Sequence, residues 1–262
     1  MNPVQSWNRM LADLAIPDQI LAAAPESPFG FAVKAFDRLA RAAMTKQTPS
    51  RARAHEALPD GGTVLDVGCG GGAASLSLAP RLGTAIGVDQ QQDMLAAFAA
   101  RASERGVAHR EIQGRWPDVA DETPDADVVA CHHVFYNVQD LGPFVHALTS
   151  HARRRVVAEV TAEHPLAWLR PLWERFHDLD RPAGPTAGDA VAALRWMGLD
   201  VAIEHWEEPS PWLDFFDELV PFVRRYLCLP ASREADIHAA LQELGLPNER
   251  RYHATLWWDG SA

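Results

Sequence analysis

The stretch Thr63-Val-Leu-Asp-Val-Gly-Cys-Gly-Gly-Gly-Ala-Ala-Ser75 constrains the fold of this chain more than any other. Val64, Leu65 and Val67 form a short apolar run that predicts a buried strand. Four glycines follow within residues 68–72, and residues 73–82 then have the pattern of a helix. Glycine tolerates positive φ and the close approach of a ligand, and the N-terminus of a helix offers free N–H groups. A strand, a glycine turn and a helix in this order predict a nucleotide-binding site.

Two classes of nucleotide are compatible with this turn. Gly68-x-Gly70-x-x-Ala73 fits the dinucleotide fingerprint, and Asp89 lies at the spacing of the acidic residue that binds a ribose in those enzymes. Asp66, however, lies two residues before the first glycine, where a carboxylate suits a cationic ligand better than a pyrophosphate. The strand also begins about sixty residues into the chain, whereas dinucleotide enzymes often begin with theirs. A nicotinamide-dependent (NAD(P)) oxidoreductase and a glycine turn without a ligand remain the alternatives.

The sequence Leu-Asp-Val-Gly-Cys-Gly-Gly-Gly at residues 65–72 closely resembles motif I of the class I S-adenosylmethionine (SAM)-dependent methyltransferases. The resemblance extends from about Arg51 to the last strand near Trp258. It implies an α/β fold with a seven-stranded, mostly parallel, doubly wound sheet whose last strand runs antiparallel between its neighbours. It also implies SAM as cofactor and methyl transfer to an oxygen or nitrogen of a small molecule. A SAM-binding protein without catalysis is a further alternative.

Composition limits the partners of the chain. The net charge of −11 argues against a surface that follows nucleic-acid phosphates. Cys69, Cys131 and Cys228 show neither metal-ligand spacing nor a paired framework, which fits a reducing compartment. The sequence has no charged leader followed by an apolar stretch and no apolar run of membrane-spanning length. We therefore expect a cytoplasmic monomer or homodimer without nucleic-acid or membrane partners.

Apolar strands alternate with helices along most of the chain, which predicts a parallel sheet with right-handed crossovers. The expected strands are 63–67, 84–88, 108–112, 127–131, 156–160, 201–206 and 253–258, and the expected helices are 48–58, 73–82, 90–105, 141–151 and 186–197.

Three segments fall outside this alternation, at 1–47, 162–180 and 209–250. We expect a single domain, 1–262, in which these segments are helical caps. The first should hold helices at 4–14, 17–24 and 31–44. The resemblance implies that it covers the cofactor and substrate, with Phe29 and Phe31 closing the pocket. Helical periodicity fits a packed core equally well.

Open α/β sheets bind ligands beyond the carboxyl ends of their strands. The resemblance places the amino-acid part of SAM against the glycine turn, and one carboxylate can accept both ribose hydroxyls. Many relatives carry an Asp after the glycine at position 114 that binds adenine, but this chain has an Arg, which cannot accept that hydrogen bond. Backbone and a stacked tryptophan, or that tryptophan as a core residue, are the alternatives there. The expected cofactor-binding residues are Asp66, Gly68, Cys69, Gly70, Asp89, Gln90, Met94, Gly114, Arg115, Trp116 and His132.

The end of the fourth strand is where SAM and acceptor meet in this family. His133 or Tyr136 is expected to face the acceptor. Glu159, inside the apolar run of the fifth strand, and His164, after that strand, are further candidate acid–base groups. We expect no metal, because the paired histidines lack a third ligand at a defined spacing. Aromatic residues in the insertions predict an apolar or aromatic substrate pocket.

Overall fold

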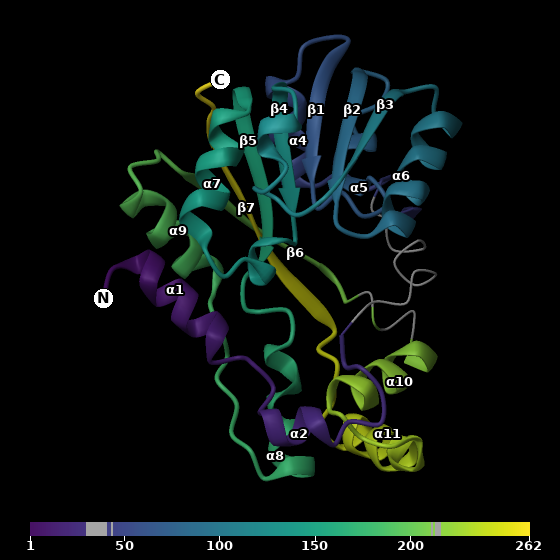
Figure 1. The fold of residues 1–262 in the computed structure, drawn as a ribbon. Helices are drawn as coiled ribbons and strands as arrows, with labels where there is room; N and C mark the ends of the chain where they lie inside the picture. The colour runs from purple at the N-terminus through teal and green to yellow at the C-terminus, as the bar shows by residue number, and fades with distance from the viewer. Residues whose placement is uncertain (30–40, 43, 211, 213–215) are drawn as a thin grey trace.

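The computed structural model describes residues 1–29, 41–42, 44–210, 212 and 216–262. At its centre lies a seven-stranded sheet with the order β3-β2-β1-β4-β5-β7-β6 (Figure 1). Strands β1 to β5 pair in parallel, whereas β7 runs antiparallel between β5 and β6. This confirms the expected doubly wound sheet with an antiparallel last strand. The strands are β1 (Gly62–Val67), β2 (Leu82–Asp89), β3 (Ala108–Gln113), β4 (Ala126–His132), β5 (Ala152–Thr161), β6 (Ala202–Pro209) and β7 (Arg250–Asp259).

Helices cover both faces of the sheet, because successive side chains of a buried strand point to opposite faces. In β1, Val64 packs with the helices α4, α5 and α6, whereas Leu65 packs with α1, α7 and α9. The helices are α1 (Pro3–Ala12), α2 (Asp18–Ala22), α4 (Pro49–Ala57), α5 (Ala73–Leu76), α6 (Gln92–Glu104), α7 (Leu141–Ser150), α8 (Arg170–His177), α9 (Ala187–Trp196), α10 (Phe216–Tyr226) and α11 (Glu234–Glu243).

Local capping signals set several helix boundaries. The Thr48 side chain accepts the backbone N–H of Arg51 at 3.2 Å, and Pro49 occupies the first turn of α4, where its missing N–H costs nothing. Thr186 and Asp189 form a capping box at the start of α9. Both helices therefore begin where the sequence predicts.

The helix expected at 73–82 is wrong in length. Helix α5 ends at Leu76, and β2 already begins at Leu82. Pro80 explains the early end, since proline has no backbone N–H to continue the helix and disfavours helical geometry at the residue before it. The expected helix at 162–180 is also shorter: a 3₁₀ turn at Ala167–Leu169 leads into α8.

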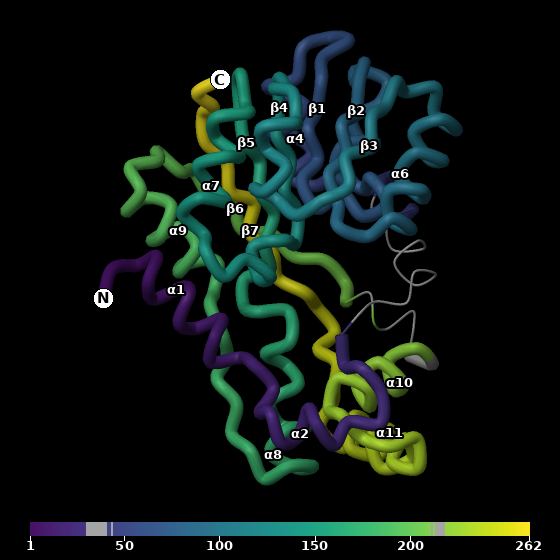
Figure 2. Tube along the Cα trace, viewed as in Figure 1, coloured from purple at the N-terminus to yellow at the C-terminus, as the bar shows by residue number. Residues whose placement is uncertain are grey.

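The insertions form an apolar cluster of their own. It joins α2, α8, α10 and α11 beyond the carboxyl ends of the parallel strands, where Figure 1 shows these helices together. Figure 2 shows the N-terminal segment running from α1, beside α7 and α9, to α2 within this group. The buried side chains of the apolar cluster include Ile16, Leu169, Leu172, Trp173, Leu219, Val223, Ile237 and Leu241.

Two sequence expectations lie wholly or partly outside the described residues. The apolar helix at 31–44 and Phe31 cannot be placed, and Phe29 is 63% exposed. In the part of the chain that the structure describes, no helix has the length and apolar character that crossing a membrane requires.

Candidate active site

The glycine turn after β1 is held to the end of β2. The backbone N–H groups of Gly68 and Cys69 both donate to the Val88 carbonyl, at 2.8 and 3.0 Å. Gly68, Gly70 and Gly72 have φ values of +70°, +49° and +80°, which L side chains rarely adopt. A Cβ built at Gly70 would meet no atom within 4 Å. The turn therefore presents backbone to open space at Gly70.

Asp89 ties this turn to the end of β2. Its Oδ2 accepts the backbone N–H of Gly70 at 2.9 Å, and its Oδ1 accepts that of Gln91, also at 2.9 Å. A carboxylate oxygen has two lone pairs, so each oxygen keeps one acceptor site. Asp89 can therefore fix the turn and still accept the two hydroxyls of a ribose.

Asp66 is turned inward rather than toward the turn's surface. It is 1% exposed, and its Oδ2 accepts both the Ser75 hydroxyl, at 2.6 Å, and the Ser75 backbone N–H, at 3.1 Å. Burial raises the pKa of Asp66 to about 6, although the bonds from Ser75 and the charge of His132 oppose this rise. These two hydrogen bonds from Ser75 thus hold the start of α5 against the end of β1.

The other expected cofactor residues lie in different environments. Gln90 and Arg115 are exposed, whereas Met94 is buried on α6, and the backbone N–H of Gly114 donates to the Asp89 carbonyl at 3.0 Å. Burial raises the pKa of the Cys69 thiol well above its usual value, so this cysteine is not a nucleophile.

Trp116 is packed into the core. It is 5% exposed, its Nε1 donates to the Phe144 carbonyl at 3.3 Å, and its ring contacts His151 edge to face. Of the two roles expected for Trp116, stacking on the adenine or packing in the core, the structure favours packing in the core.

A group of polar side chains lies at the carboxyl ends of β4 and β5. His133 has φ +59°, and its Nε2 lies 3.0 Å from Glu159 Oε1. His253 of β7 places its Nδ1 4.0 Å from the same oxygen and its Nε2 3.2 Å from Glu208 Oε1. Lys46 in turn pairs with Glu208 at 2.5 Å. We call His133, Glu159 and His253 the His–Glu–His cluster.

Burial sets the protonation of the first pair in this cluster. It lowers the pKa of His133 to about 4, so the imidazole is neutral at pH 7. Burial, the largest single influence, opposes ionisation of Glu159, but the hydrogen bond from His133 and the other favourable contacts of the carboxylate together outweigh it and hold the pKa of that carboxyl well below its usual range. The pair is therefore a neutral imidazole against a carboxylate.

Tyr136 and His164 lie apart from this pair but close to one another. The Tyr136 hydroxyl lies 2.7 Å from Thr161 Oγ1, and burial raises its pKa to about 12. The His164 ring meets the Tyr136 ring edge to face at 5.5 Å, and its Nδ1 accepts the Leu166 N–H at 3.3 Å. Burial lowers the pKa of His164 to about 4. Both groups thus remain neutral at pH 7.

Sequence reasoning missed His253 and Glu208. Glu159 lies opposite Thr255 in the β5–β7 pair, so His253, two residues from Thr255, shares its face as a diagonal neighbour. Trp206 lies opposite His253 in the β6–β7 pair, and Glu208 is again the diagonal neighbour. The signal was available in principle, because an antiparallel last strand beside the fifth brings its polar residues to Glu159.

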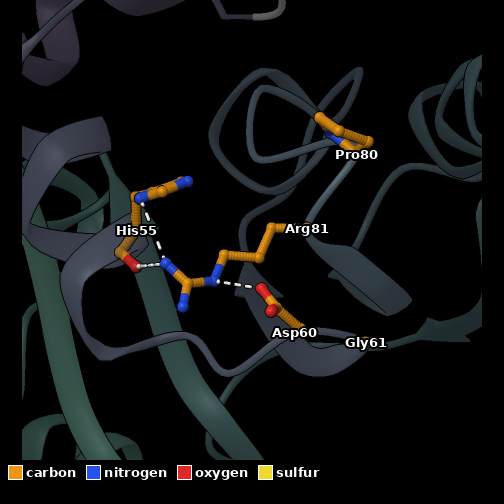
Figure 3. A pocket seen from close by; sticks show the side chains of 5 residues that line it. All are labelled: His55, Asp60, Gly61, Pro80 and Arg81. Carbon is orange, nitrogen blue, oxygen red and sulfur yellow. Dashed lines mark hydrogen bonds and ion pairs between the residues drawn. The ribbon is translucent and has the colours of Figure 1, made fainter.

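A separate hollow lies at the opposite end of the parallel strands, where β1 and β2 begin (Figure 3). Arg81 fills much of it: its Nε pairs with Asp60 Oδ1 at 2.9 Å, and its Nη1 donates to the His55 carbonyl at 3.3 Å. None of the expected cofactor residues lines it. The hollow is lined by His55, Asp60, Gly61, Pro80 and Arg81.

Comparisons with known proteins agree with this geometry. Residues 64–158 match a family model described as a methyltransferase domain. Over 112 residues the chain is 33% identical to the ubiquinone biosynthesis O-methyltransferase of Aeromonas salmonicida, covering 42% of this chain and 47% of that protein. Over 165 residues it is 29% identical to the protein of the same name from Azorhizobium caulinodans, covering 55% and 65%. The chain therefore matches about half to two thirds of the length of these curated relatives.

Solved structures share the fold. A SAM-dependent methyltransferase from Thiobacillus denitrificans, in complex with S-adenosyl-L-homocysteine, aligns with a TM-score of 0.57 at 19% identity over 88% of this chain and 99% of that one. Magnesium protoporphyrin IX methyltransferase from Synechocystis PCC 6803, with bound S-adenosylhomocysteine (SAH), aligns with a TM-score of 0.53 at 18% identity over 93% and 92%. The segment 64–158, which carries the glycine turn, Asp89 and His133, is therefore similar to a methyltransferase domain, and the chain shares the fold of these two methyltransferases.

Proposed function

We propose that this protein transfers the methyl group of SAM to a small-molecule acceptor. The observation that carries the proposal is the pairing of the glycine turn with Asp89 inside the segment that matches the methyltransferase model. The open space at Gly70 admits the amino-acid part of SAM against the backbone, and the free acceptor sites of Asp89 suit its ribose hydroxyls. The two structural neighbours with bound SAH support the same choice of cofactor.

The acceptor is an oxygen or nitrogen nucleophile that reaches the ends of β4 and β5. Methyl transfer needs the nucleophile in line with the sulfonium carbon, so the protein contributes orientation and close approach. His133, with 36% of its side chain exposed, is the polar group of the His–Glu–His cluster that an acceptor can reach. The curated relatives are named O-methyltransferases, which favours a hydroxyl acceptor.

Isothermal titration with SAM, SAH and NAD tests the cofactor. We expect SAM and SAH to bind at one site per chain and NAD not to bind. Binding of NAD with no binding of SAM would overturn the proposal and favour an oxidoreductase.

Turnover tests whether the bound cofactor is used. Incubation with labelled SAM and a panel of phenols, catechols and amines should transfer label to at least one acceptor. SAM binding without transfer to any member of a broad panel would favour a non-catalytic SAM-binding protein.

A further inference from the structure

We propose that the His–Glu–His cluster binds a divalent first-row transition-metal ion, with Zn²⁺ as the ion to test first. Two imidazoles and one carboxylate form a donor set that such ions favour, and His₂Glu with one open position is a known arrangement of catalytic zinc. The donor atoms of His133, Glu159 and His253 lie within 4.8 Å of one another. Ligands of a tetrahedral zinc ion lie roughly 3.4 Å apart, so shifts on the order of 1 Å complete the site.

Distances separate an ion site from a purely hydrogen-bonded network. His133 Nε2 lies 3.0 Å from Glu159 Oε1, which is a normal hydrogen bond. His253 Nδ1 lies 4.0 Å from the same oxygen, which is too long for one. An ion between the three groups would satisfy both contacts, with the single proton of the neutral His133 imidazole carried on Nδ1 instead of Nε2.

A buried nitrogen atom without a hydrogen bond supports the same conclusion. His253 is 1% exposed, and its Nδ1 has no hydrogen-bond partner among the residues that the structure describes. A buried polar group without a partner costs free energy, and native proteins rarely leave one. A metal ligand would explain this histidine.

The surroundings of His253 are those of an oriented metal ligand. Glu208 Oε1 lies 3.2 Å from its Nε2, so a carboxylate faces the nitrogen opposite Glu159. Ligand histidines commonly direct their second nitrogen to a carboxylate, which fixes the ring and strengthens the donor. Trp206 stacks on the imidazole at 4.3 Å and limits its rotation. Nδ1 is thereby directed to Glu159.

The site opens on one side only. Glu159 and His253 have side chains 9% and 1% exposed, whereas that of His133 is 36% exposed. An ion held there would keep a position for water or an acceptor hydroxyl beside His133, a role that rests on the proposed methyl transfer. The ion would lower the pKa of the acceptor hydroxyl, and the hydroxyl proton would pass to solvent. The acceptor oxygen would then bond the methyl carbon as the carbon–sulfur bond of SAM breaks and SAH leaves.

Metal binding is tested directly on tag-free protein stripped with chelator. Titration with ZnCl₂ should show one ion per chain, and Co²⁺ should give the visible absorption of a low-symmetry site. His133→Gln and His253→Gln should each weaken Zn²⁺ binding on the order of 100-fold, and Glu208→Gln about tenfold. His205→Gln, on the exposed side of β6, is the matched control and should bind as the wild type does.

Folding and cofactor binding are followed in the same samples. Circular dichroism shows whether the buried His253→Gln variant folds, and the more exposed His133→Gln gives a second answer if it does not. Wild-type protein with no stoichiometric Zn²⁺ or Co²⁺ binding, or binding that survives both histidine substitutions in folded variants, overturns the proposal. SAM titration without metal reports separately on the proposed function, so either result can fail alone.

Discussion

Asp89 connects the stability of the glycine turn to cofactor binding. It accepts one backbone N–H from the turn and one from the segment after β2, and in the proposed complex it also accepts the ribose hydroxyls. We expect Asp89→Ala to weaken SAM binding by about 2–4 kcal/mol, because each bond to a charged group contributes about 1.5–3 kcal/mol and the two are not additive. Titration of the folded variant measures the loss.

Two controls accompany this substitution. Asp89→Asn keeps one acceptor oxygen and should lose less affinity, whereas Asp93→Ala on the exposed side of α6 should lose none. An unchanged dissociation constant in Asp89→Ala would show that the ribose is bound elsewhere.

Asp66 gives a pH dependence of stability with a definite sign. Its folded-state pKa of about 6 lies above the ordinary value of 3.8, so the folded state keeps a proton that the unfolded state loses. The stability that the protonated Asp66 contributes to the folded state is fully present below pH 4 and is lost as pH rises to about 6. We therefore expect the stability of Asp66→Asn, relative to wild type, to improve by up to about 3 kcal/mol between pH 4 and pH 7.

Urea unfolding of both proteins at several pH values measures this difference. A constant difference across the range would mean that Asp66 titrates in the folded state near its ordinary pKa.

At the scale of the element, the strand–turn–helix unit could be predicted because its signals are local. Buried strands, positive-φ glycines and the downstream acid all lie within residues 63–89. The length of α5 was overestimated because the helical spacing of apolar residues continues to Leu82, although Pro80 prevents the helix from extending that far. The position of Trp116 could not be decided, since an aromatic residue after a strand fits both a core and a ligand-stacking site.

The His–Glu–His cluster shows the limit of local signals. His133 and Glu159 were found because the first follows the predicted fourth strand and the second lies near the end of the predicted fifth. His253 lies near the start of a strand about a hundred residues away, and only the β5–β7 register brings it to Glu159. Pairing of distant strands is a tertiary property, so residue spacing along the chain does not reveal it.

Substitutions at two glycines distinguish the loss of space for the cofactor from the backbone strain of a side chain at positive φ. Gly70 and Gly61 both have positive φ, and a Cβ at either meets nothing within 4 Å. Gly61, however, lies just before β1, at the opposite end of that strand from the glycine turn. Gly70→Val and Gly61→Val should therefore lose similar stability, about 1–3 kcal/mol each. Only Gly70→Val should lose SAM binding.

Thermal unfolding and SAM titration of both variants test this expectation. Full SAM binding by a folded Gly70→Val protein would mean that the glycine serves the turn alone.

At the scale of the whole molecule, the chain combines a sheet domain with the separate apolar cluster of α2, α8, α10 and α11. This cluster lies beyond the carboxyl ends of the strands, where the proposed cofactor and acceptor bind (Figure 1). Methyl transfer benefits from a site that excludes water, and segments that open and close over such sites come from the less stable parts of a fold. The cluster and the N-terminal segment are therefore candidates for a cover.

Amide hydrogen exchange distinguishes a cover from a permanently packed core. We expect α8, α10 and α11 to exchange faster than β1, β4 and β5, because these strands are paired on both sides in the centre of the sheet. Adding SAH should slow exchange most in the segment 1–47, and the Asp89→Ala protein at the same SAH concentration should show no such effect. If these segments are core alone, they will exchange as slowly as the central strands and SAH will change nothing. That outcome would show that these segments do not act as a cover. It would not contradict the proposed cofactor site, because the glycine turn and Asp89 belong to the sheet.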